Sequence, residues 1–129
     1  MNRQVFMGIA ATVSVGSGLA ALIAPAQLAA IFGVTLDDVG MSQTRLLGTA
    51  YLGYAATNWF ARGVRDVTAQ RAIALGNLVS WTLGLIVTAV GIVTGLAGAQ
   101  GWVLVAMEVA FAAAWGYFTF VDRTEIAST

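Results

Sequence analysis

The sequence contains no cysteine, no histidine and no lysine, and it has a single proline. These absences exclude disulfides, thiol catalysis, the usual zinc sites, histidine-ligated haem, Ser-His triads and Schiff bases. Little chemistry remains beyond simple proton transfer by a carboxyl group. We therefore expect a protein that is not an enzyme and that carries neither a cofactor nor a metal.

Charge is also scarce, at 9 % of 129 residues, whereas a soluble domain carries about 25 %. Hydrophobic residues make up 59 % of the chain and the mean hydropathy is +0.84. A water-soluble fold could not cover so much apolar surface with so few charges. The net charge of zero gives no electrostatic case for nucleic acid. This composition predicts a single membrane domain over residues 1–129, with membrane lipid as its surroundings.

Four long apolar runs account for this composition, at residues 5–24, 46–61, 72–95 and 102–121. About twenty apolar residues cross the hydrocarbon core of a bilayer. The second run is short, but arginine side chains at its two ends can reach the interface and extend it. Short connections between the runs predict an all-α, antiparallel four-helix bundle in the membrane, with up-down-up-down topology. Pro25 to Phe32 predicts a short interfacial helix after the first span.

Arginine placement predicts how the chain is oriented. With both termini in the cytoplasm, the inner side holds Arg3, Arg62, Arg65, Arg71 and Arg123. The outer side then holds only Arg45, as the positive-inside rule requires. We therefore expect a multi-pass membrane protein with both termini in the cytoplasm. A cleaved secretory signal ending near Ala24-Pro25-Ala26 is an alternative, although the first run is longer than the apolar core of most signals.

Small residues recur every four positions along the runs, as at helix contacts within membranes. The stripes are Ala10, Ser14 and Gly18; Thr49, Gly53, Thr57 and Ala61; Gly76, Ser80, Gly84 and Thr88; and Ala106, Ala110 and Ala114. They predict packing between helices of one subunit, and the alternative is a contact between copies in a homo-oligomer.

Glu108 is the charged residue that lies within an apolar run, about 9 Å below the outer end of its helix. A carboxyl group at that depth should face protein or water rather than lipid. It either holds helices together or forms a proton-linked, cation-linked or ligand-binding site, and we favour the structural role. Arg45, Tyr51 and Thr88 lie at a similar predicted depth. Our site hypothesis is that these four residues form a polar cluster in the outer half of the membrane. Arg45 either pairs with Glu108 in this cluster or anchors its helix at the lipid headgroups, and for Arg45 we favour the anchoring role.

A second set of candidates lies towards the inner side. Asn58 and Asn77 fall at matching depths on neighbouring helices, where their amides could bond to each other. Trp81 lies near mid-membrane, too deep for an aromatic belt, so it fills the core or lines a pocket. With Tyr51 and Tyr54 it could wall a site for a lipid or another hydrophobic molecule.

Two segments carry the recognisable local signature, residues 44–62 and 71–79. They come with an early Ala24-Pro25 and with Gly-Val-Thr-Leu-Asp, residues 33–37, before Arg45-Leu-Leu-Gly48. Over residues 16–120 the arrangement resembles small four-span bacterial membrane proteins of unknown function, such as the DoxX-like family. The resemblance implies an inner-membrane four-helix bundle and supplies no activity.

The sequence is therefore compatible with three functions. We favour a non-enzymatic accessory or structural subunit, in a homo-oligomer or a larger membrane complex, because polar pathway residues are scarce. The alternatives are a small proton- or cation-coupled transporter or channel that uses Glu108, and a binder of lipid or hydrophobic small molecules.

Overall fold

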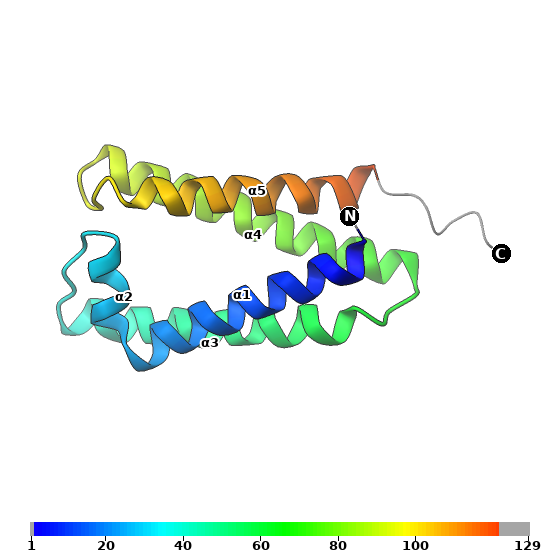
Figure 1. Ribbon diagram of the computed structural model, residues 1–129, viewed down its shortest axis with the longest axis horizontal. Helices are drawn as coiled ribbons and strands as arrows, with labels where there is room; N and C mark the ends of the chain where they lie inside the picture. Colours follow the sequence, from blue (N-terminus) through cyan, green and yellow to red (C-terminus); the bar gives the residue numbers. More distant parts are fainter. Residues whose placement is uncertain (1, 122–129) are drawn as a thin grey trace. The chain divides into compact units, whose positions relative to one another are not determined.

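The computed structural model describes residues 2–121, so the tail 122–129, with Arg123, lies outside the described residues. The described residues form five helices and no strand, which confirms the predicted all-α class (Figure 1). The helices are α1 (Arg3–Ile23), α2 (Pro25–Ile31), α3 (Asp38–Ala61), α4 (Val67–Val93) and α5 (Gly101–Phe120).

The chain divides into two compact units. The first comprises residues 1–63, with α1, α2 and α3, and the second begins at Val64 and contains α4 and α5. The packing of the helices into one four-helix bundle therefore stays a prediction.

Three helices are long and apolar enough to cross a membrane: α1, α4 and α5. The third helix, α3, has 24 residues and is long enough, but it is not among them. It carries Asp38, Arg45 and Asn58 among its apolar residues. The fourth predicted span therefore stays a prediction, whereas the other three runs coincide with candidate spans.

Capping side chains set where the helices begin. α1, α3 and α4 each follow a residue whose side chain accepts a hydrogen bond from the first turn, namely Asn2, Asp37 and Asp66. At the other end, α2 and α4 stop beside Gly33 and Gly95, whose φ angles are 72° and 76°. Glycine adopts this left-handed conformation without the steric penalty that a Cβ atom would bring.

Two helix starts differ from the prediction. The second apolar run begins at Leu46, but α3 begins at Asp38, so Arg45 lies inside the helix. The third run begins at Ala72, but α4 begins at Val67. In both cases the aspartate cap defines the start and the charged residues that follow it are helical, because hydrogen bonding rather than apolar character fixes a helix boundary.

The cap of α3 can be tested directly. Asp37 Oδ1 accepts a hydrogen bond from Gly40 N at 2.7 Å. We expect Asp37→Ala to lower the free energy of unfolding by about 1 kcal/mol. Asp37→Asn should lower it much less, because the amide oxygen can still accept the hydrogen bond from Gly40 N. Reversible unfolding in mixed micelles measures both changes. Equal losses for the two variants would contradict the capping role.

Within the first unit, α1 and α3 run antiparallel and approach closely where glycines meet (Figure 1). A Cβ atom on Gly48 would lie 2.8 Å from Gly18 O, and one on Gly18 would lie 2.9 Å from Leu52 Cγ. Gly18 was predicted to be in a packing stripe, but its partner is Gly48. By contrast, Gly53 of the predicted α3 stripe has no atom within 4 Å of its Cβ position. The predicted stripe on α3 is therefore not the one that packs against α1.

The second unit is a helical hairpin of α4 and α5. Its contacts run in opposite order along the two helices: Gly101 with Ile92, Glu108 with Thr88, Phe111 with Trp81, and Gly116 with Leu78. Two of the three residues in the predicted alanine stripe of α5, Ala106 and Ala110, are exposed and lie outside this contact. Aromatic side chains and a carboxyl group fill the interface instead.

Candidate functional site

The most unusual group in the second unit is the Glu108 carboxyl. Glu108 lies on α5 and only 5 % of the residue is exposed. Thr88 Oγ1, on α4, donates a hydrogen bond to Glu108 Oε1 at 3.1 Å. The hydroxyl and the carboxyl therefore join the two helices of the hairpin.

Gly84 leaves the room that this carboxyl occupies. It lies one turn before Thr88 on α4, so the two residues share a face of the helix. A Cβ atom on Gly84 would lie 3.1 Å from Glu108 Oε1, which is closer than ordinary contact. Any larger side chain at this position would compete with the carboxyl for space.

An aromatic pair lies one turn further along the hairpin. Trp81 of α4 and Phe111 of α5 stack with ring centroids 4.4 Å apart and planes 15° apart. Phe111 follows Glu108 by three residues and Trp81 precedes Gly84 by three, so the stack and the carboxyl lie on the same helix faces. Trp81 thus makes the kind of packing contact predicted for a core residue.

The two carboxyl oxygens of Glu108 differ in their surroundings. Oε2 is buried and has no hydrogen-bond partner among the residues that the structure describes. A buried polar atom without a partner destabilises a fold by about 1–3 kcal/mol. Such an oxygen can accept a hydrogen bond or bind a cation when the carboxyl group is ionised. When it carries a proton, it can donate a hydrogen bond.

The other members of the predicted polar cluster belong to the first unit. Arg45 is exposed and Tyr51 is half-buried, both on α3. Of the four predicted members, the structure brings Thr88 and Glu108 together. Contact of Arg45 or Tyr51 with Glu108 stays a prediction.

The two candidate amides are both buried, Asn58 on α3 and Asn77 on α4. Asn77 Nδ2 donates to Ile73 O of its own helix at 2.9 Å. The predicted amide pair joins residues of different units and stays a prediction. Among residues 2–121 there is no group of three acidic side chains close enough to hold a metal ion.

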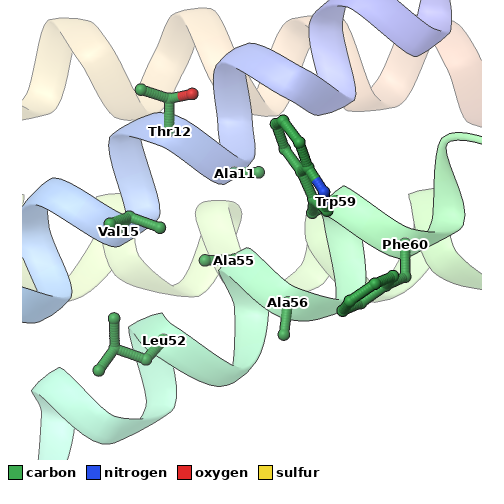
Figure 2. A pocket seen from close by; sticks show the side chains of 8 residues that line it. All are labelled: Ala11, Thr12, Val15, Leu52, Ala55, Ala56, Trp59 and Phe60. Carbon is green, nitrogen blue, oxygen red and sulfur yellow. The ribbon is translucent and has the colours of Figure 1, made fainter.

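The first unit carries a groove that was not predicted from the sequence. It lies between α1 and α3 and has a volume of about 390 Å³ (Figure 2). Its lining residues are Ala11, Thr12, Val15, Leu52, Ala55, Ala56, Trp59 and Phe60. The usable signal was Trp59 next to Phe60 and three residues before Arg62 at the end of an apolar run.

Comparison with known protein families, curated proteins and solved structures finds no match to this chain. The resemblance to the DoxX-like family stays a prediction.

Proposed function

We propose that this chain is a small integral membrane protein that acts without catalysis, as an accessory or structural subunit of a homo-oligomer or a larger membrane complex. One observation carries the proposal: three long helices leave large apolar side chains exposed along their length. On α4, for example, Leu83, Val87 and Val90 are all more than half exposed. Surfaces of this kind are stable in lipid, or against another membrane protein, and not in water.

The proposal includes a fourth span and an orientation. α3 would cross with Arg45 and Arg62 reaching the two interfaces, and both termini would face the cytoplasm of a bacterium. Support comes from the arginine distribution, with five residues on one side and one on the other. The four spans would bury their small residues against one another and leave branched aliphatic side chains to lipid.

A second candidate function rests on Glu108. Its Oε2 atom, buried and without a partner among the described residues, supports a proton- or cation-coupled transporter or channel. We rank this second because Thr88 already engages Oε1 across the hairpin, which suits a structural tie between α4 and α5. A transporter would also need a polar route on either side of the carboxyl.

Membrane extraction and native mass spectrometry test the proposal. We expect the expressed chain to stay in the membrane pellet after an alkaline wash and to require detergent for release. Gentle extraction should then give a mass of several copies, or of one copy with another subunit. Recovery as a monomer in detergent-free buffer would contradict the proposal.

The variant Glu108→Gln separates the two candidate functions. If Glu108 is a structural tie, the amide oxygen still accepts from Thr88, so the native mass should match that of the wild type. If Glu108 couples transport, pH-dependent cation flux into proteoliposomes should be present in the wild type and lost in the variant. Absence of flux in the wild type would remove the second candidate.

A further inference from the structure

The α1–α3 groove has almost entirely apolar walls. At one end stand Trp59 and Phe60, and at the other lie Val15 and Leu52 (Figure 2). The polar side-chain groups in the lining are the Thr12 hydroxyl, which already donates to Gly8 O at 2.9 Å, and the indole N–H of Trp59. The groove therefore offers a ligand mainly apolar contacts. Its volume of about 390 Å³ is within the range of about 300–1,000 Å³ typical of ligand pockets.

One cation lies at the aromatic end of the groove. Arg62 Cζ is 3.4 Å from the centroid of the Trp59 ring, and Arg62 Nε donates to Trp59 O at 3.0 Å. A Cβ atom on Gly8 would lie 3.6 Å from Arg62 Nη1. The guanidinium therefore lies between Trp59 of α3 and Gly8 of α1, one turn beyond Ala11 of the groove.

The acidic residues of this unit cannot neutralise that cation. Asp37 and Asp38 lie at the start of α3, whereas Arg62 follows its last residue, and a helix of 24 residues is about 36 Å long. The contacts of Arg62 with Trp59 use its Nε atom and one planar face of the guanidinium. Its terminal nitrogens keep donors suited to a phosphate, which a guanidinium can bind through two parallel hydrogen bonds.

We propose that the groove binds one glycerophospholipid with an anionic headgroup, with an acyl chain along α1 and α3 and the phosphate at Arg62. The stretch from Leu52 to Phe60 covers about 12 Å of α3, enough for part of one chain. Tryptophan at the mouth suits the interface between hydrocarbon and headgroups. The site rests on the proposed function, since it supposes that the unit lies in a bilayer.

The headgroup, and not the chain, would decide which lipid binds. An acyl chain is as apolar in the bilayer as in the groove, so its transfer gains little. The phosphate–guanidinium contact differs between lipids, because a zwitterionic headgroup carries its own cation and an anionic one does not. We therefore expect phosphatidylglycerol to be retained in preference to phosphatidylcholine with the same acyl chains.

Native mass spectrometry of detergent-solubilised protein, mixed with equal amounts of these two lipids, measures that preference. We expect the wild type to retain one phosphatidylglycerol per chain, about fivefold over phosphatidylcholine. Arg62→Gln should bring the ratio close to one. Arg71→Gln, which removes an exposed arginine outside this unit, should leave the ratio unchanged. Equal retention by the wild type, or an unchanged ratio in Arg62→Gln, overturns the proposal.

A second pair of variants tests the groove itself. Ala56 is an exposed lining residue, so Ala56→Phe should fill the groove without disturbing the core and should lower retention of both lipids. Ala110→Phe, at an exposed position of α5, is the matched control and should retain both. If Ala56→Phe changes the number of copies and spares phosphatidylglycerol, the groove is an interface between copies and the lipid proposal fails.

The failure of the lipid site can be told from failure of the proposed function. A chain that leaves the membrane pellet without detergent fails at the extraction step, before any lipid is added. A chain that needs detergent but shows no headgroup preference keeps the membrane proposal and loses the lipid site.

Discussion

Replacing Gly48 with valine is expected to force α1 and α3 apart and to lower the free energy of unfolding by about 3 kcal/mol. The Cβ position on Gly48 lies 2.8 Å from Gly18 O and 3.0 Å from Leu22 N. Both are backbone atoms of α1, so no rotation of a side chain can relieve the clash. The whole helix must move, and the contacts along the α1–α3 interface must loosen with it.

Gly53→Val is the matched control for this prediction. Gly53 lies on the same helix, is exposed, and has no atom within 4 Å of its Cβ position. Both variants replace a helical glycine with valine, so their change in helix propensity is the same. The difference between their free energies of unfolding therefore measures the effect of packing. Unfolding of detergent-solubilised protein by increasing sodium dodecyl sulfate provides the two free energies. Equal values for the two variants would show that α1 and α3 do not meet at Gly48.

The positions of the helices could be predicted because each apolar run is bounded by charged or turn-forming residues. The starts of α3 and α4 were placed too late, since a capping aspartate lies several residues before the apolar run that it serves. Hydropathy indicates which residues are apolar enough for lipid, whereas capping residues mark where the backbone hydrogen bonds of a helix begin. The two signals agree only when a cap directly precedes an apolar residue.

The contacts between helices were harder to predict than the helices. Small residues lie on several faces of α3, and periodicity alone does not say which face meets α1. Gly48 forms part of Arg45-Leu-Leu-Gly48, a motif that was considered as a family signature and not as a packing site. On α5, alanines every four residues suggested a contact face, but Phe111 and Glu108 form the contact with α4. Large side chains can pack where the opposing helix provides a glycine.

For the candidate site as well, some features could be predicted from the sequence and others could not. Thr88 and Glu108 could be paired from sequence because both were placed at one depth on consecutive helices. The role of Gly84 in making room for the carboxyl was not predicted, since a stripe of small residues gives no indication of what it faces. The groove beside Arg62 was also missed, because a hollow arises from the shapes of two helices together.

The structural tie at Glu108 leads to the second large expected effect. Gly84→Leu should fill the space beside Glu108 Oε1 and separate the carboxyl from Thr88, which in the proposed bilayer would turn the carboxyl towards lipid. The loss should be about 2–3 kcal/mol, the amount by which a carboxyl at this depth opposes insertion. The control is Gly91→Leu, two turns further along α4, where no atom lies within 4 Å of the Cβ position. Gly91→Leu should not lower the unfolding free energy, because leucine favours a helix over glycine by several tenths of a kcal/mol to about 1 kcal/mol.

A double-mutant cycle then identifies the cause of the Gly84→Leu effect. In the Glu108→Ala background the carboxyl is absent, so leucine at position 84 meets a cavity and should restore packing. The two changes should therefore be strongly non-additive, with a coupling energy of about 1–3 kcal/mol. Additive losses would mean that Gly84 and Glu108 act independently, and the account of α4 and α5 held together at this carboxyl would be wrong.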